Sequence, residues 1–333
     1  MKLEQMPRYP LLCGFTPLQR MENLEQALGC GPLYIKRDDL TPLVLGGNKT
    51  RKLEFLLGDA LAGGADTLVT VGGVQTNHGR LTAAAAAKAG LACTLVLDGA
   101  RPEKLSGNLL LDCLLGASLV YTDGRSTSAV IEETLAALQA AGRAPYFIPE
   151  GGSNAVGSAG YLAMVPELLA QADSLPVPPA RLVCTMGSLG TFAGLWLGAR
   201  AFGAPFSVTG VAVNPTTGYT REKAAALVNE MSAAYGLDIA AAPEDMDIIY
   251  ADAAHDYAGP GYNVPDAKTR GAVELLARTE GIFLDPCYTA KSFRGFCDIA
   301  RELDGGAIFV HTGGTPALWT QEHLDAFAAD YWN

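Results

Sequence analysis

The stretch "LVLGGNKTRKLEFLL", residues 43–57, joins a Gly-Gly turn directly to the start of an amphipathic helix. The i, i+3, i+4, i+7, i+8 spacing of one helix face is met by Leu53, Leu56, Leu57, Ala60 and Leu61. Lys49 stands at the helix start, where partial positive charge makes a cation mildly unfavourable. Either Lys49 points into water, or the site uses its amine.

The same alternation of strand and helix extends along the whole chain. Short β-rich runs occupy residues 33–37, 67–71, 93–97, 118–121, 146–148, 181–185, 208–213 and 307–310, and helical patterns lie between them. Apolar strands alternating with helices predict an α/β fold with parallel sheets covered on both faces. One regular unit spans residues 48–160 and a second begins near 181, so we expect two domains with a cleft between them. Ligands in such sheets bind at the carboxyl ends of the strands.

The totals exclude several classes of function. The 333 residues carry a net charge of -11, which argues against nucleic acid and anionic membranes as partners, although a small anionic ligand stays possible. No apolar run is long enough to span a membrane, and the first ten residues lack the apolar core of a secretion signal. The seven scattered cysteines indicate reduced thiols and a cytoplasmic protein, and the four histidines show no metal-ligand spacing.

The loop after the run at 67–71 reads "GGVQTNHGR", residues 72–80. Thr76 and Asn77 are good N-cap residues, and together with His78 they would start an Ala-rich helix. The free N–H groups of such a helix end could hold a carboxylate. An ordinary capped turn is an equally good interpretation of this loop alone.

The loop after the run at 181–185 contains Gly187, Ser188, Leu189, Gly190 and Thr191. Glycines that let N–H groups converge, with two hydroxyls, form an anion cradle suited to phosphate. The sequence matches neither the G-x-G-x-x-G motif nor a Walker loop, and glycines that serve only a turn are the alternative.

Two later loops place hydroxyl groups after strand-like segments. "DPCYT" presents Tyr288 and Thr289, and "HTGG" presents Thr312 after His311. Tyr288 could stack on a ring or move a proton, although buried structural tyrosines are commoner. His311 is better explained as a packed core histidine than as a catalyst.

The four loops and Lys49 together suggest one chemistry. A lysine that reacts with a phosphorylated aldehyde needs a phosphate cradle, a carboxylate site and an uncharged amine. A buried lysine near a positive helix end would lose its proton more easily. This explains the placement of Lys49.

Five segments resemble the D-cysteine desulfhydrase / 1-aminocyclopropane-1-carboxylate deaminase family. They are "IKRDDLTPLVLGGNKTRKLE", "GGVQTNHGR", "GPGYNVPDA", "LLARTEGIFLDPCYTAKS" and "HTGGTPAL", and the resemblance extends, in order, over almost the whole chain. The resemblance implies a pyridoxal-phosphate enzyme of fold type II, similar to tryptophan synthase β, with two open twisted sheets and the cofactor in the cleft between domains. It implies a large domain of residues 1–47 plus 163–333, a small domain of 48–162, and a homodimer.

The resemblance also implies roles for particular residues. Lys49 matches the Schiff-base lysine, Asn77 the partner of the cofactor's ring oxygen, and Thr312 the hydroxyl at the pyridine nitrogen. The substrate-carboxylate site matches Thr76 and the neighbouring N–H groups as far as His78. The phosphate loop matches Gly187, Ser188, Leu189, Gly190 and Thr191. The active-site tyrosines match Tyr262 and Tyr288, and Asn77, Tyr262 and Thr289 are expected to contact the substrate.

Two positions favour the desulfhydrase branch. The deaminase branch has glutamate and leucine where this chain has Thr289 and Thr312. We therefore expect β-elimination from D-cysteine, giving pyruvate, sulfide and ammonia. Thr76 replaces the family's usual serine and adds a methyl group beside the substrate, so L-cysteate, 2,3-diaminopropionate, L-cysteine and the cyclopropane amino acid stay open as substrates. A non-catalytic two-domain ligand-binding protein is the alternative of a different class.

Overall fold

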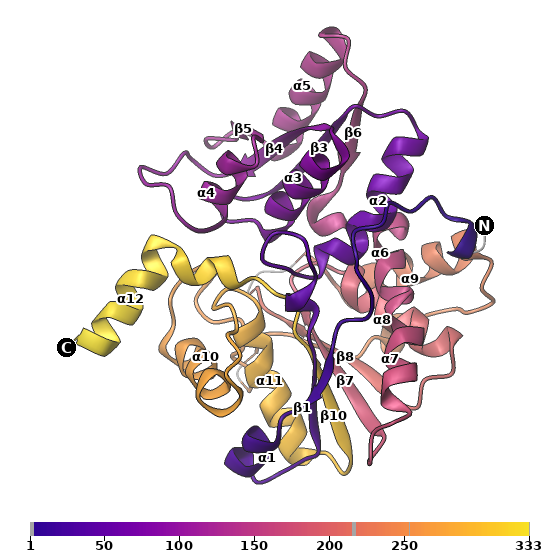
Figure 1. Ribbon diagram of the computed structural model, residues 1–333, viewed down its shortest axis with the longest axis vertical. Helices are drawn as coiled ribbons and strands as arrows, with labels where there is room; N and C mark the ends of the chain where they lie inside the picture. The colour runs from indigo at the N-terminus through magenta and orange to yellow at the C-terminus, as the bar shows by residue number, and fades with distance from the viewer. Residues whose placement is uncertain (1–2, 215–217, 253, 333) are drawn as a thin grey trace.

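The computed structural model describes residues 3–214, 218–252 and 254–332. Its strands form two separate sheets, as the sequence predicts (Figure 1). All eight predicted strand runs are confirmed, and the short strands β1 and β9 at the edges of the larger sheet are additional.

The larger sheet has six strands in the order β1-β2-β10-β7-β8-β9, and only β1 runs antiparallel to its neighbour. The bounds are β1 Leu18–Arg20, β2 Leu33–Lys36, β7 Pro179–Met186, β8 Ser207–Ala212, β9 Ile248–Ile249 and β10 Gly306–Val310. The helices that accompany this sheet are α1 Glu22–Leu28, α7 Met164–Ala172, α8 Gly190–Ala201, α9 Arg221–Tyr235, α10 Ala267–Glu280, α11 Thr289–Glu302 and α12 Gln321–Trp332.

The smaller sheet is entirely parallel, in the order β5-β4-β3-β6. Its strands are β3 Thr67–Gly73, β4 Ala92–Asp98, β5 Ser118–Tyr121 and β6 Pro145–Ile148. Its helices are α2 Lys49–Ala62, α3 Asn77–Ala89, α4 Gly107–Leu114, α5 Thr127–Ala140 and α6 Ala155–Leu162. Short 3-10 turns complete the chain at η1 Leu3–Gln5, η2 Asp38–Leu40, η3 Glu150–Gly152, η4 Pro243–Asp245 and η5 Thr315–Trp319.

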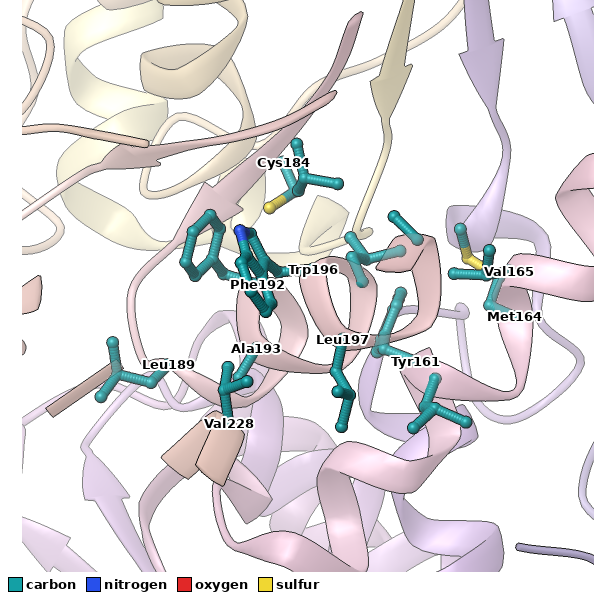
Figure 2. Packing of buried hydrophobic residues seen from close by; sticks show 14 of the residues in the cluster. Tyr161, Met164, Val165, Cys184, Leu189, Phe192, Ala193, Trp196, Leu197 and Val228 are labelled. Carbon is teal, nitrogen blue, oxygen red and sulfur yellow. The ribbon is translucent and has the colours of Figure 1, made fainter. Parts of the chain in front are cut away.

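Two large apolar clusters hold the half of the molecule built on the larger sheet. One surrounds α8, where Figure 2 shows Phe192, Trp196 and Leu197 among buried neighbours. The other stacks Phe293, Phe296 and Phe309, with ring centroids 5.3–5.7 Å apart. These clusters make a rigid base below the loops at the carboxyl ends of the strands.

Helices α2, α6 and α8 pack in series and connect the two halves. A Cβ atom on Gly160 of α6 would lie 2.3 Å from the carbonyl oxygen of Arg51 on α2, so only glycine permits this close helix contact. The strands of the larger sheet all lie in the predicted large domain, and those of the smaller sheet all lie in the predicted small domain. The domain boundaries at residues 48 and 162 stay a prediction.

Candidate active site

A cavity of about 580 Å³ lies where strands of both sheets end. The smaller sheet contributes the ends of β3 and β4 with the start of α3, and the larger sheet contributes the loops after β7, β8 and β10. Its lining includes ten of the thirteen predicted site residues: Lys49, Thr76, Asn77, His78, Gly187, Ser188, Thr191, Tyr262, Tyr288 and Thr312. The structure therefore brings together loops that lie up to 263 residues apart (49 to 312).

Lys49 is the first residue of α2, and its amine points into this cavity rather than into bulk water. Its Nζ donates to Oδ1 of Asn48 at 2.9 Å, and Nδ2 of Asn48 donates to the hydroxyl of Thr191 at 3.0 Å. Burial lowers the pKa of Lys49 to about 8; the charge of Glu150 opposes this shift and the charge of Arg80 adds to it. The predicted helix start at Lys49 is confirmed. The ready loss of its proton stays a prediction, which the direction of this pKa shift favours.

The start of α8 forms an anion pocket with a donor set that the sequence only partly revealed. Ser153 accepts from the N–H of Gly190 at 3.1 Å and donates to Ser188 at 2.8 Å. A Cβ on Gly190 would lie 2.7–2.9 Å from Nζ of Lys52 and the hydroxyls of Ser153 and Ser158. The amine of Lys52 and two hydroxyls converge on this point at a helix N-terminus, and these are groups that a phosphate can use as hydrogen-bond donors.

Lys52 is the notable member of this pocket because it is fully buried without a carboxylate partner among the residues that its hydrogen bonds reach. Its Nζ donates to the carbonyl of Gly151 at 2.9 Å and to Ser153 at 3.3 Å. Burial and then the charge of Lys49 hold the pKa of Lys52 well below its usual range. A bound anion would supply the missing negative charge and restore the ammonium form.

The start of α3 forms the opposite wall. The Thr76 hydroxyl accepts from the N–H of Gly79 at 3.2 Å and caps the helix, as predicted. The preceding N–H groups of a helix have no intrahelical acceptor and are available to a carboxylate. His78 is buried and neither ring nitrogen has a partner within the described chain; burial, followed by Lys49 and Lys52, holds its pKa well below the usual range. His78 is therefore a neutral polar group in the wall.

Tyr262 and Tyr288 form a pair with ring centroids 5.7 Å apart and planes at 72°. Tyr288 lies against Gly187, where a Cβ would come within 2.8 Å of its ring, and Tyr262 lies against Gly73 at 3.0 Å. Burial raises the pKa of both hydroxyls well above the usual range, so both stay protonated at neutral pH. Because Tyr262 comes from the larger half and Gly73 from the smaller, this contact joins the two halves at the cavity.

Three predicted site residues do not line the cavity. Leu189 packs in the apolar cluster around α8, where Figure 2 labels it, and Gly190 is the first residue of α8. Thr289 is fully buried, and its hydroxyl donates to Oδ1 of Asp285 at 2.7 Å. The expected contact of Thr289 with substrate is wrong, because Thr289 does not line the cavity. Its hydroxyl instead binds the Asp285 carboxylate at the start of α11.

His311 takes the structural role expected of it. Its Nε2 donates to the carbonyl of Phe283 at 2.9 Å, and its Nδ1 accepts from the N–H of Gly313 at 3.2 Å. Thr312 lies next to it in the cavity wall, and its carbonyl accepts from the N–H of Asn48 at 3.0 Å. The last strand thus fixes both Thr312 and the residue that precedes Lys49.

Sequence reasoning missed Asn48, Lys52, Ser153 and Asp285. The i, i+3 spacing of Lys49 and Lys52 places both on one helix face, which could have indicated Lys52. Ser153 and Asp285 act through contacts that join distant segments, and no local pattern shows them. Within the described residues no group of three or more His, Cys, Asp or Glu side chains could hold a metal. None of the described helices is long and apolar enough to cross a membrane.

Comparisons with known proteins agree with this geometry. The family described as "Pyridoxal-phosphate dependent enzyme" matches residues 10–313. A D-cysteine desulfhydrase of Yersinia enterocolitica is 41% identical over 328 residues, covering 96% of this chain and 97% of the relative. A putative 1-aminocyclopropane-1-carboxylate deaminase of Pyrococcus abyssi is 38% identical, covering 95% and 94%. A crystal structure described as an ACC deaminase homologue has a TM-score of 0.88 at 35% identity, covering 98% and 97%.

Proposed function

The chain belongs to the pyridoxal-phosphate dependent enzyme family and is a lyase that uses this cofactor, and we propose that its substrate is D-cysteine. The predicted resemblance and the fold type II architecture are confirmed. The proposed reaction is β-elimination to pyruvate, hydrogen sulfide and ammonia. The observation that carries the proposal is a single cavity lined by Lys49, whose pKa is lowered to about 8, and by residues of the first turns of α3 and α8.

The residues of the cavity fit pyridoxal 5'-phosphate. The phosphate would lie at the start of α8, held by Lys52, Ser153, Ser158, Ser188 and Thr191, where the hydroxyl of Ser158 lacks a partner in the described structure. Lys49 would hold the aldehyde carbon, and Asn77 and Thr312 would meet the ring from opposite halves of the molecule. The bound cofactor supplies an electron sink for the bonds broken at the α-carbon of the substrate.

The chain's own groups account for the proton transfers. The Lys49 amine, largely deprotonated above pH 8, takes the α-proton of the substrate as general base. Thr76 and the α3 N-terminus hold the α-carboxylate and keep that proton near Lys49. The protonated hydroxyls of Tyr262 and Tyr288 provide the proton that a departing thiolate needs. Tyr262 also contacts Gly73 of the smaller half, so this side chain spans the cavity between the two halves.

The desulfhydrase branch is favoured by Thr312 and by Thr289. Thr312 presents a neutral hydroxyl at the cavity wall where the deaminase branch has leucine. The relative named D-cysteine desulfhydrase is 41% identical and the putative deaminase 38%, so both branches are similarly distant. Elimination from L-cysteine, L-cysteate or 2,3-diaminopropionate would use the same groups, and the cyclopropane amino acid is the remaining candidate.

The test is release of keto acid from the cofactor-loaded protein. D-cysteine, L-cysteine, L-cysteate, 2,3-diaminopropionate and β-chloro-D-alanine would be compared by pyruvate formation, and the cyclopropane amino acid by α-ketobutyrate. We expect pyruvate and sulfide in equal amounts from D-cysteine. Turnover of another substrate alone would overturn D-cysteine and keep the elimination, and the Thr76→Ser variant would then test the added methyl group. A protein that binds no cofactor would support the non-catalytic alternative.

We further propose a homodimer in the cytoplasm. Three large apolar side chains in the N-terminal segment are strongly exposed: Phe15 at 65%, Leu40 at 52% and Leu45 at 51%. The Thr16 hydroxyl donates to Oδ1 of Asp38 at 2.7 Å, which joins the segments that carry them. All seven cysteines are free thiols, as expected in a reducing compartment. Sedimentation of the wild type against Leu45→Asp tests the dimer; a monomeric wild type would contradict it.

A further inference from the structure

Asn108 is a buried residue that the proposed reaction leaves without a role. It is the second residue of α4 and is fully shielded from solvent. Its Nδ2 donates to the carbonyl of Gln75 at 2.8 Å and to Oδ1 of Asn77 at 2.9 Å. Its backbone N–H donates to Oε1 of Gln75 at 2.9 Å. Asn108 is therefore hydrogen-bonded to the loop that leads into α3, and it does not itself line the cavity.

These contacts determine which way two amide groups face. The Gln75 carbonyl can only accept, so the Asn108 group facing it must be the NH2 group. The second hydrogen of that NH2 group then points at Asn77 and requires an acceptor, which is Oδ1 of Asn77. With its oxygen turned toward Asn108, Asn77 presents its own NH2 group to the cavity that it lines. A backbone carbonyl thus sets the orientation of a cavity side chain through one intermediate residue.

We propose that Asn108 is a positioning residue that holds Asn77 as a hydrogen-bond donor toward the anionic ring oxygen of pyridoxal phosphate. This inference rests on the proposed function. If the Asn77 amide were reversed, it would present an oxygen to the ring oxygen of the bound cofactor, and two acceptors cannot form a hydrogen bond with each other. Asn108 removes the reversed orientation, because its NH2 group cannot meet the NH2 group of Asn77.

A purely structural role for Asn108 explains less. Its Oδ1 is buried without a partner in the described part of the chain, which is a standing cost to the fold. An apolar residue would avoid that cost at a buried helix position. The side chain is nevertheless an amide, and both of its hydrogens are used on the loop that carries Asn77.

Two variants of Asn108 test the inference through the cofactor rather than through turnover. Asn108→Asp removes both donors at nearly constant shape, and Asn108→Leu removes them without adding charge. We expect the dissociation constant for pyridoxal phosphate to rise roughly 10- to 100-fold in both, the effect of losing one hydrogen bond to a charged group. We also expect the visible absorption band of the bound cofactor to shift, because the protonation of its ring oxygen changes.

A double-mutant cycle separates positioning from general damage. In an Asn77→Ala background the Asn108 variants should cause no further loss, since Asn108 acts through Asn77. Asn229→Asp is a matched control. Asn229 lies on α9, outside the cavity lining, and its Nδ2 also donates to a backbone carbonyl, that of Ala241, at 2.9 Å. It should leave affinity and spectrum unchanged.

The outcomes distinguish this inference from the proposed function. A wild-type protein that binds cofactor, with Asn108 variants of unchanged affinity and spectrum, would overturn the inference alone. An equal loss in the Asn77→Ala background would overturn it as well, because Asn108 would then act by another route. A wild type that binds no pyridoxal phosphate would overturn the proposed function and this inference together.

Discussion

Two faces of helix α2 treat buried positive charge in opposite ways. On one face, Arg51 donates to both oxygens of Asp38 at 2.8–2.9 Å and to Glu167 at 2.8–2.9 Å. On the other face, called the unpaired face below, Lys49 donates to the amide oxygen of Asn48 and Lys52 donates to the carbonyl oxygen of Gly151. Both acceptors are neutral. The three residues lie within one turn of the same helix.

The ionisation of the two faces follows from these partners. Burial alone would lower the pKa of Arg51, but the charges of Asp38 and Glu167 outweigh it and raise that pKa well above the usual range. Burial lowers the pKa of Lys49 to about 8 and takes that of Lys52 well below its usual range. Cations with internal counter-charges hold the fold, whereas cations without them require an external anion or must lose their proton.

The face of α2 that carries Arg51, called the paired face below, also fixes the position of Lys49 on the unpaired face. Lys36 donates to Glu167 at 2.5 Å, and Tyr161 donates to Asp38 at 2.6 Å, so the ion network joins β2, α6 and α7 to the first turn of α2. The start of α2 cannot move without disturbing that network. The amine of Lys49 is thereby held in position before any ligand arrives.

Lys49→Ala should give the largest effect on activity. Loss of both the covalent lysine and the general base should reduce kcat by at least roughly 10³-fold. Steady-state pyruvate release measures this, and phosphate-dependent binding of the cofactor should persist through the α8 pocket. Lys88→Ala, at an exposed position of α3, is the matched control and should keep full activity. An active Lys49→Ala protein would contradict the assignment of the unpaired face to chemistry.

Arg51→Met should give the largest effect on stability. Removing Arg51 leaves Asp38 and Glu167 buried with too little positive charge, and breaking such a buried pair costs about 3–5 kcal/mol. Urea unfolding of the cofactor-free protein measures this as a lower midpoint with an unchanged slope. Cofactor affinity of the folded fraction should fall less than in Lys52→Met, because the hydroxyls and the amine at the start of α8 are all retained and only the placement of Lys49 is loosened. A large loss of cofactor affinity without loss of stability would contradict the assignment of Arg51 to the fold rather than to the cofactor site.

Lys52→Met should show the opposite pattern to Arg51→Met. The variant removes a buried amine without a counter-charge, so the cofactor-free protein should be as stable as the wild type or more so. Affinity for pyridoxal phosphate should fall roughly 10- to 100-fold, because a charge-assisted bond to phosphate is lost. Parallel urea unfolding and cofactor titration measure both effects. A less stable cofactor-free protein with unchanged cofactor affinity would show that Lys52 stabilises the fold and does not bind the cofactor.

The sequence predicted what depends on local pattern. Strand and helix periodicity identified the strands of both sheets apart from the short edge strands β1 and β9, since apolar runs and glycine stops are local signals. Lys49 was found for the same reason: a cation at a helix start after two glycines conflicts with local propensity, and such conflicts often mark functional sites.

The rest of the site depends on contacts between distant segments. Arg51 and Glu167 lie 116 residues apart, and Asn108 and Asn77 lie 31 apart, so no spacing rule connects them. Thr289 shows the same limit. The family resemblance implied a substrate contact for Thr289, but at the first turn of α11 its hydroxyl donates to Asp285. A glutamate at position 289 would bring a second carboxylate next to the buried Asp285, so exchanging the branch residues would also perturb this helix start.

The smallest effect, and the sharpest measure of the unpaired face, is the pH dependence of cofactor capture by Lys49. Only the neutral amine reacts with an aldehyde, and burial lowers the pKa of Lys49 to about 8. The neutral fraction then rises roughly tenfold from pH 7 to 9 and levels off, whereas a lysine with an ordinary pKa would gain roughly a hundredfold and keep rising. Stopped-flow growth of the cofactor's visible band measures the rate.

Glu150 allows the electrostatic origin of that midpoint to be tested. It lines the same cavity, and its negative charge favours the protonated amine of Lys49, opposing the effect of burial. Glu150→Gln should therefore move the midpoint below that of the wild type, so that capture is faster at pH 7 and unchanged at pH 9.5. A midpoint that moves upward, or a wild-type rate that still climbs at pH 10, would mean that the amine of Lys49 is solvated as an ordinary lysine and that the two faces of α2 do not differ as described.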